Sequence, residues 1–269
     1  MNNRIEGETT GTEKDISSKL PLWLDFRFNG WGEKFEASWD NMIPLKLWAL
    51  GSFLNVAKYE NHQDFVLEGG SIESDGRGTV FTTSQCLLAP HRNQPLTKDE
   101  IERELKCRLH ADRVVWLDHG TLTGDDTDGH IDTIVRYAPD DTLLYIRCDN
   151  PNDEQYNDFL ALEQQLQQLR TIDGKPYRLL SLPMPDAIFE GQGERLPATY
   201  ANFLVLNGAV LVPVYDQLEN DAEALRVIQK AFPDREMVPI DARTIIRQHG
   251  SVHCLTMQIP DIQEEIVGS

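Results

Sequence analysis

One order of elements, a hairpin followed by a helix and then a strand, recurs three times along the 269 residues. The three hairpin turns fall at Asp75-Gly76, Pro139-Asp140-Asp141 and Asn207-Gly208. Asp-Gly and Asn-Gly suit tight turns with positive φ. The turns at residues 75, 140 and 207 are separated by 65 and 67 residues. This spacing predicts an α/β fold of related units, either arranged around an axis or side by side in a plain α/β sheet.

The three units are expected over similar lengths. The first has strands at Asp64–Leu67 and Thr79–Thr83, a helix opened by Thr97 and Glu100 as a capping box, and a closing strand at Arg113–Leu117. The second has strands at Ile131–Tyr137 and Thr142–Arg147, a helix from Asp153 through Arg170 and a strand at Tyr177–Leu182. The third has strands at Asn202–Leu206 and Ala209–Val214, a helix from about Asp221 to Phe232 and a strand at Met237–Ile240.

Partial units are expected at both ends. Leu22–Phe28 is strand-like, and Ser38 is placed to cap a helix over Trp39–Phe53 that Pro44 interrupts. Cys254–Ile259 is expected to be a single strand. We therefore predict one domain over residues 20–260, between polar tails at residues 1–19 and 261–269.

Composition excludes several classes of protein. With 40% apolar and 26% charged residues the chain is not disordered, and no window approaches the ~18 apolar residues of a membrane span. The polar start has no signal-peptide core, so a cytoplasmic protein without membrane contact is expected. Four cysteines without CxxC spacing favour reduced thiols and no zinc site. A net charge of −19 argues against nucleic acid and is compatible with a cationic ligand.

Rotation of related units about an axis would bring distant polar residues together. Glu68, His130, Asn202 and Cys254 each lie near the leading edge of a unit or of the last strand. A carboxylate, a histidine and a thiol are then expected to converge near the axis.

Each of these residues also has a plainer interpretation. Cys254 follows a glycine loop and is either an accessible nucleophile or a small buried hydrophobe, which is the interpretation preferred for Cys86, Cys107 and Cys148. His130 and Asp132 would share one face of a strand. They form an acid/base pair, a surface histidine beside the acidic turn Asp125–Asp128, or a metal pair completed by His119, His253 or Cys254.

Two glycine-rich segments are similarly open to interpretation. Glu68-Gly69-Gly70 either lets backbone approach a polar cation that Glu68 accepts, or is a bulge at a strand end. Asn29-Gly30-Trp31-Gly32 is a tight turn whose tryptophan either lines a pocket or covers a core.

Taken in order, five segments resemble the agmatine deiminase family, which also carries the label peptidylarginine deiminase. They are Phe26–Gly32, Leu67–Ile72 with Asp75-Gly76 and Gly78-Thr79, Gly129–Asp132, Asn207-Gly208, and Gly250–Thr256. The resemblance spans roughly Leu22 to Pro260.

The resemblance implies the pentein fold, an α/β propeller of ββαβ modules around a pseudo-symmetry axis. It also implies hydrolysis of a guanidino group without metal or organic cofactor. Cys254 would attack the guanidinium carbon to form a thiouronium, His130 would act as acid and base, and Glu68, Gly69 and Asp132 would bind the cation. The implied substrate is agmatine, converted to N-carbamoylputrescine and ammonia on the route to putrescine.

The chain departs from the family pattern at its N-terminus, where an Arg-Asp-x-x-x-Pro motif with a second guanidinium-binding aspartate is missing. We therefore expect a pentein domain incomplete at the N-terminus. Three functions are alternatives: an agmatine deiminase, a deiminase of arginine in peptides, or a truncated pentein that binds guanidino ligands or a partner without turnover. The pattern also allows a homo-oligomer.

Overall fold

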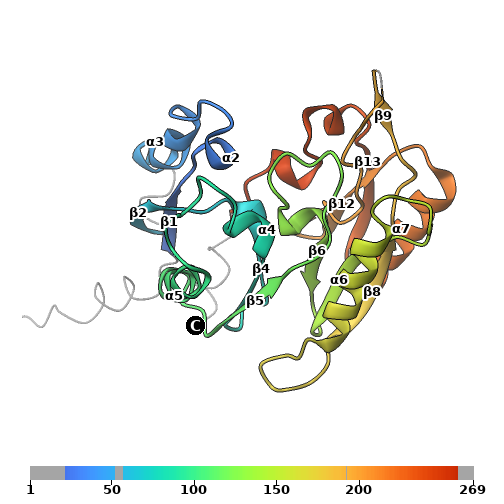
Figure 1. Ribbon diagram of the computed structural model, residues 1–269, viewed down its shortest axis with the longest axis horizontal. Coiled ribbons are helices and arrows are strands. Elements are labelled where there is room, and N and C mark those ends of the chain that lie inside the picture. The colour runs from blue at the N-terminus through green and yellow to red at the C-terminus, as the bar shows by residue number, and fades with distance from the viewer. Residues whose placement is uncertain (1–21, 52–56, 192, 260–269) are drawn as a thin grey trace, which may run out of the picture.

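The computed structural model describes residues 22–51, 57–191 and 193–259. The two predicted tails, residues 1–19 and 261–269, lie outside these residues. Within them the chain forms a parallel pair of strands followed by three three-stranded sheets and one short hairpin (Figure 1).

The N-terminal pair consists of two parallel strands, with two short α-helices and a 3-10 turn, Asp40–Met42, in the connection. They are β1 (Leu22–Arg27), α2 (Gly30–Glu33), α3 (Ile43–Ala49) and β2 (Lys58–Val66). The expected strand at Leu22–Phe28 is confirmed, but the expected helix is wrong in detail. Helix α3 is preceded by Met42 rather than Ser38, and Pro44 lies in its first turn, where the missing N–H has no helical partner to lose.

The first module has the predicted hairpin turn with a different leading strand. Its elements are β3 (Ile72–Ser74), β4 (Thr79–Thr83), α4 (Ser84–Leu87), α5 (Lys98–Arg108) and β5 (Arg113–Leu117). Gly76 makes the turn at φ +63°, and β4 pairs antiparallel with β3 and parallel with β5. Asp64–Leu67 was expected to pair with Thr79–Thr83. That prediction is wrong, because β2 uses its ladder hydrogen bonds on β1.

Helix α5 begins where the sequence predicts. Thr97 Oγ1 accepts from the amide of Glu100, and the Glu100 carboxylate accepts from the amide of Thr97. The helix buries Ile101 and Leu105. Such a cap contributes about 1 kcal/mol, and the two buried side chains fix which face of the helix packs on the sheet.

The second and third modules repeat the pattern closely. The second comprises β6 (Val135–Ala138), β7 (Thr142–Arg147), α6 (Tyr156–Gln168) and β8 (Arg178–Pro183). The third comprises β11 (Leu204–Leu206), β12 (Ala209–Val214), α7 (Leu218–Ala231) and β13 (Glu236–Asp241), after the short hairpin β9 (Phe189–Glu190) and β10 (Glu194–Arg195). In both modules the middle strand pairs antiparallel with the first and parallel with the last. The predicted ββαβ order is therefore confirmed.

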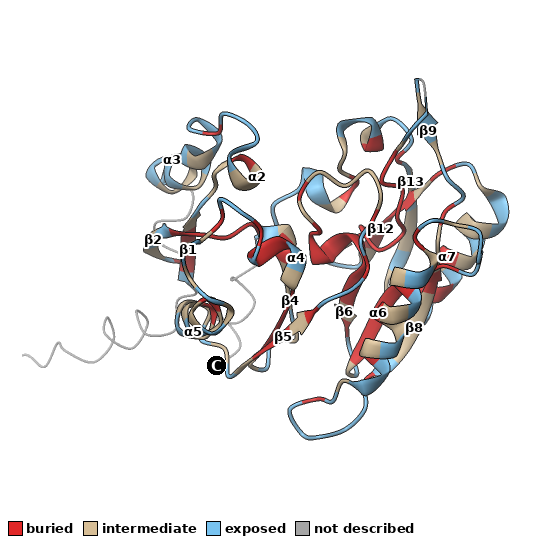
Figure 2. Cartoon of the chain, viewed as in Figure 1, coloured by how far each residue is buried: buried red, intermediate tan, exposed pale blue. Residues whose placement is uncertain are grey.

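A buried arginine joins the three modules through their leading segments. Arg136 on β6 donates from Nε to Glu73 Oε2 on β3 at 2.9 Å and from Nη1 to the Phe203 carbonyl at 2.5 Å, just before β11. The buried residues in Figure 2 follow the strands and the inner faces of α5, α6 and α7. The hydrogen bonds of Arg136 therefore hold the first strands of the three modules, β3, β6 and β11, next to one another.

The end of the described chain is not a strand. His253–Leu255 form a 3-10 turn, and Thr256–Ile259 join no sheet of the described residues, so the prediction of a strand at Cys254–Ile259 is wrong. In the part of the chain that the structure describes, no helix combines the length and apolar character needed to cross a bilayer.

Candidate active site

Glu68 is held at the end of the apolar run Phe65–Leu67, all three of whose residues are buried. A 3-10 turn, Gly69–Ser71, comes next, and Ser71 donates from both its amide and its hydroxyl to the Glu68 carbonyl. The sequence predicted Glu68 within the first hairpin. It lies instead directly after β2, which pairs with β1. Its side chain is 4% exposed, so its charge needs fixed partners.

A buried arginine supplies one of these partners. Arg92 Nε donates to Glu68 Oε1 at 2.9 Å, Nη1 donates to Asp128 Oδ2 at 2.8 Å, and Nη2 donates to the Thr127 carbonyl at 2.8 Å. Lys34 also pairs with Asp128. Sequence reasoning missed Arg92, because nothing in a single sequence separates a buried arginine in a loop from an exposed one. The acidic turn Asp125–Asp128 is consequently part of the site's support and not a solvated loop.

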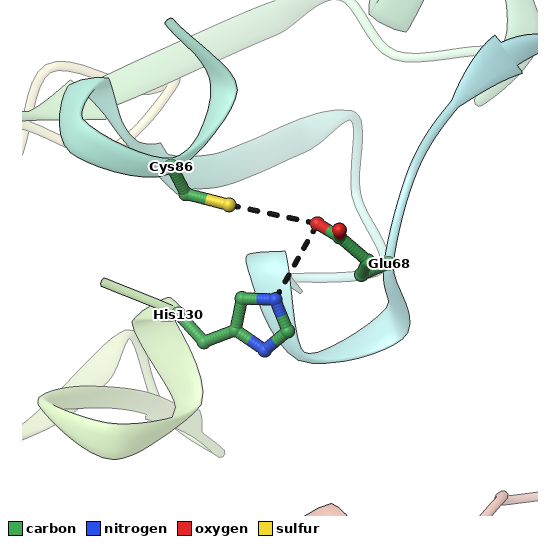
Figure 3. A group of neighbouring side chains, drawn as sticks. All are labelled: Glu68, Cys86 and His130. Carbon is green, nitrogen blue, oxygen red and sulfur yellow. Dashed lines mark hydrogen bonds and ion pairs between the residues drawn. The ribbon is translucent and has the colours of Figure 1, made fainter. Parts of the chain in front are cut away.

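The second oxygen of Glu68 faces a histidine and a thiol. His130 Nε2 lies 3.4 Å from Glu68 Oε2, and Cys86 Sγ lies 3.6 Å from the same oxygen (Figure 3). Cys86 is buried in a small apolar cluster, as expected, but its sulfur faces Glu68 and Arg92. Cys107 was also expected to be buried and is exposed.

Asp132 stands on the other side of His130. The two residues do not alternate on a strand, because Ile131–Thr133 form a 3-10 turn ahead of β6. The turn still directs both side chains to one place. A Cβ on Gly70 would lie 2.6 Å from His130 Nδ1 and 3.0 Å from Asp132 Oδ2. Only glycine leaves room there, whereas Gly69 has no neighbour within 4 Å of such a Cβ among the described residues.

The Asp132 carboxylate is only half satisfied. Its Oδ2 contacts His253 Nδ1 at 2.7 Å and Cys254 Sγ at 3.9 Å. Its Oδ1 is buried and has no hydrogen-bond partner within the described residues. An ionised oxygen left in this way costs free energy that a donor entering the site would recover.

Asn202 fixes the position of the Cys254 loop. Its Oδ1 accepts from the amides of His253 at 2.8 Å and Cys254 at 3.2 Å. The structure thus brings together the four residues that the repeat was expected to gather: Glu68 contacts His130, Asn202 holds Cys254, and Cys254 reaches Asp132. His119 lies apart, 3.3 Å from Asp158.

The three buried ionisable groups of the site favour one another's charged forms. Burial favours a higher pKa for Glu68, but the His130 hydrogen bond and the charges of His130 and Arg92 outweigh it and lower the pKa. Burial also opposes ionisation of His130, yet its bonds to Cys86 and Glu68 and the charge of Asp132 hold its pKa well above the ordinary value. Burial opposes ionisation of Asp132 too, but the His253 hydrogen bond and nearby cationic groups lower its pKa.

The Cys254 thiol is not activated in the free protein. Dense packing around the sulfur and the charge of Asp132 raise its pKa to about 11, although the residue as a whole is exposed. The accessible nucleophile that the sequence left open is therefore not one whose pKa the protein lowers by itself. A positive charge brought beside the sulfur would favour the thiolate.

The turn Asn29-Gly30-Trp31-Gly32 supports the site without lining it. Trp31 packs edge-on against Phe28 and Phe35, with ring centroids 5.1 and 5.7 Å away. Asn29 Nδ2 donates to the His91 carbonyl, beside Arg92. Of the two interpretations left open, the contacts favour packing in a small aromatic cluster over the lining of a pocket, although Phe35 at its edge is exposed.

The sequence model of the Porphyromonas-type peptidyl-arginine deiminase family matches residues 11–260. The chain belongs to this family. A Vibrio parahaemolyticus relative named "Putative agmatine deiminase" is 35% identical over 254 residues, covering 88% of this chain and 70% of the relative.

Solved structures of this family superpose closely. A Porphyromonas gingivalis protein named "Putative Arginine Deiminase" is 53% identical with a TM-score of 0.87, covering 89% of this chain and 70% of that one. The agmatine deiminase of Enterococcus faecalis is 30% identical with a TM-score of 0.80, over 88% and 69% of the two chains. An amidinotransferase from Microseira wollei, 16% identical with a TM-score of 0.50, shares the fold alone. The predicted pentein fold is confirmed; within the described residues its sheets do not close into a barrel.

Proposed function

We propose that this chain is a guanidine-hydrolysing deiminase whose substrate is agmatine, which it converts to N-carbamoylputrescine and ammonia. The proposal rests on one arrangement above all. A buried carboxylate whose Oδ1 lacks a partner among the described residues, Asp132, lies beside a cysteine sulfur, 3.9 Å from its other oxygen. A planar cation that donates paired N–H groups to Asp132 would place its carbon next to that sulfur.

The substrate's own charge accounts for the nucleophile. At about 4 Å and an effective dielectric constant of about 20, one positive charge stabilises a thiolate by about 4 kcal/mol, roughly a thousandfold in the ionisation equilibrium. Pairing with the cation also offsets the repulsion that Asp132 exerts on the sulfur. Cys254 is therefore a thiol in the free protein and becomes a thiolate nucleophile when a guanidinium binds, its proton passing to solvent.

The remaining steps use His130. The thiolate adds to the guanidinium carbon, and the carbon–nitrogen bond to the departing amine breaks as protonated His130 gives it a proton. Ammonia and a thiouronium result. Neutral His130 then takes a proton from water, and the hydroxide adds to the same carbon. The carbon–sulfur bond breaks as the hydroxyl proton of this intermediate passes to the sulfur, which releases the ureido product and restores the thiol. Glu68 binds the cation on the opposite side, and Gly69 and Gly70 admit it close to the backbone.

The proposal extends to the chain as a whole. Residues 20–260 form the catalytic domain and the protein acts in the cytoplasm. The substrate class and its binding site require no metal or organic cofactor, because the guanidinium supplies both the electrophilic carbon and the charge.

A second candidate is a deiminase of arginine in peptides. The family model carries that activity in its name, and the 53% identical Porphyromonas gingivalis structure is named an arginine deiminase. Both substrates present the same guanidinium to Asp132 and Cys254. They differ at the far end of the alkyl chain, where agmatine carries a single amine and the peptide carries its backbone.

The test is formation of ureido product and ammonia from agmatine and, separately, from an arginine peptide. We expect agmatine to turn over and Cys254→Ala to abolish turnover, with Cys107→Ala as the exposed-thiol control. Turnover of the peptide alone would transfer the function to the second candidate. A folded protein that turns over neither substrate would leave only a guanidino-binding scaffold.

A further inference from the structure

The structure contains a second thiol that the proposed reaction does not use. Cys86 is fully buried at the start of α4, and Thr83 holds this turn by accepting from the Cys86 amide. The sulfur points at Glu68 Oε2, which His130 Nε2 also faces (Figure 3). One sulfur, one nitrogen and one carboxylate oxygen all lie within 4.8 Å of one another.

Two of the three separations match the edges of a tetrahedral metal site, and the third, from the Cys86 sulfur to the His130 nitrogen, is no more than 4.8 Å. With ligand bonds of about 2.0 Å to nitrogen and oxygen and about 2.3 Å to sulfur, neighbouring ligands of Zn²⁺ lie about 3.3–3.5 Å apart. The observed distances are 3.4 Å from nitrogen to oxygen and 3.6 Å from sulfur to oxygen. The donor set of one thiolate, one imidazole and one carboxylate suits Zn²⁺ or a similar cation and disfavours Mg²⁺ and Ca²⁺.

The surroundings already provide the second layer that a metal site needs. Glu68 Oε1 is held by Arg92 Nε, which leaves Oε2 for the cation, and Arg92 is itself anchored by Asp128 and the Thr127 carbonyl. Such outer bonds orient ligands in metal sites. The Arg92 Nη2 atom lies 4.0 Å from the sulfur, so the arginine's charge opposes the cation while the charges of Asp128 and Asp132 favour it.

We propose that Glu68, Cys86 and His130 bind one Zn²⁺-like divalent cation that inhibits the protein. The bound cation displaces the thiol proton of Cys86 and the proton shared by His130 and Glu68, and both protons pass to solvent. A water molecule is the fourth ligand. Because the cation occupies Glu68 and His130, it removes the acid/base group and one cation-binding carboxylate at once. This inhibitory consequence rests on the proposed function, whereas the binding itself does not.

The binding test uses Co²⁺ added to the metal-free full chain, because a thiolate ligand gives Co²⁺ a characteristic near-ultraviolet charge-transfer band. We expect one Co²⁺ per chain, with the band, and its displacement by Zn²⁺. Cys86→Ser should remove the band and weaken binding at least about 100-fold, since losing even an outer partner costs about 10–100-fold. Cys107→Ser is the matched control and should retain both.

A second variant covers the case in which Cys86→Ser does not fold. A protein with Cys107, Cys148 and Cys254 all changed to Ser retains Cys86 as its only thiol, and the band must survive in it. Loss of the band there, or its persistence in folded Cys86→Ser, would place the metal on Cys254 with His253 and Asp132 and overturn the proposal. Absence of any Co²⁺ binding would overturn it as well.

The two proposals fail separately. A chain that binds Co²⁺ through Cys86 without deiminating agmatine would contradict the proposed function and leave the metal site standing. A chain that deiminates agmatine and binds no Co²⁺ would contradict the metal site and leave the proposed function standing. If both hold, Zn²⁺ should inhibit turnover, and a chelator should restore it.

Discussion

The two buried carboxylates of the site differ in how completely the protein satisfies them. Both oxygens of Glu68 have partners, Arg92 on one and His130 with Cys86 on the other. Within the described residues, Asp132 has partners on Oδ2 alone. Glu68 is thus a finished carboxylate, which a bound guanidinium has to share with Arg92 and His130, and Asp132 is an unfinished one, held ready for a missing donor. Arg92 compensates the charge of Glu68 within the protein, whereas one oxygen of Asp132 stays available to a bound cation.

The largest effect should come from the unfinished carboxylate. Asp132→Asn removes the charge that attracts the guanidinium, so kcat/KM for agmatine should fall by about 10³-fold, equivalent to about 4 kcal/mol for a buried ion pair. The free energy of unfolding of Asp132→Asn in urea should differ from that of the unchanged protein by less than about 1 kcal/mol. In the unchanged protein, the cost of burying Oδ1 without a partner already offsets the stabilisation that Oδ2 gains from His253.

Glu68→Gln is the matched variant for stability. It replaces one of the two carboxylates that pair with the buried Arg92 guanidinium by a neutral amide and leaves Asp128 as the other, so the free energy of unfolding should fall by about 2–4 kcal/mol. Equal losses of stability in the two variants would break the distinction between a finished and an unfinished carboxylate.

The next effect concerns the loop that places the thiol beside Asp132. Asn202→Ala removes the side-chain acceptor of the His253 and Cys254 amides and leaves His253 only the backbone carbonyl of residue 202. The sulfur should therefore shift, and kcat should fall by about 100-fold with little change in KM. Steady-state kinetics on agmatine measure this, with exposed Asn207→Ala as the control. A fall confined to KM would show that Asn202 serves binding and not the placement of sulfur.

The smallest effect sharpens the comparison between the two thiols. Cys254 has its pKa raised to about 11, so below that pH the free protein holds the unreactive thiol. Alkylation by iodoacetamide should rise about tenfold per pH unit from pH 7 towards pH 11. Mass spectrometry of the modified peptide separates Cys254 from Cys86, which is fully buried and should stay unmodified. If Cys254 were alkylated rapidly at pH 7 and no faster at higher pH, the thiolate would form without a substrate charge, which would contradict the proposal.

Local sequence predicted the regular elements well. The capping box at Thr97 and Glu100 starts α5, and the turns at Gly76 and Gly208 close two of the three hairpins. These features act within a few residues and need no distant partner. The leading strand of the first hairpin was misplaced because β1, more than 30 residues earlier, competes for the same segment.

The sequence alone determined the repeated ββαβ order, the family resemblance and the convergence of Glu68, His130, Asn202 and Cys254. Periodicity and turn chemistry are written in neighbouring residues, and rotation of equal units brings equal positions together. Only the tertiary structure decided which atoms meet: that Arg92 neutralises Glu68, that Asp132 keeps one oxygen without a partner among the described residues, and that Cys86 turns its sulfur towards Glu68 and His130. Burial and pairing of charges depend on every element packed around them, which no local pattern records.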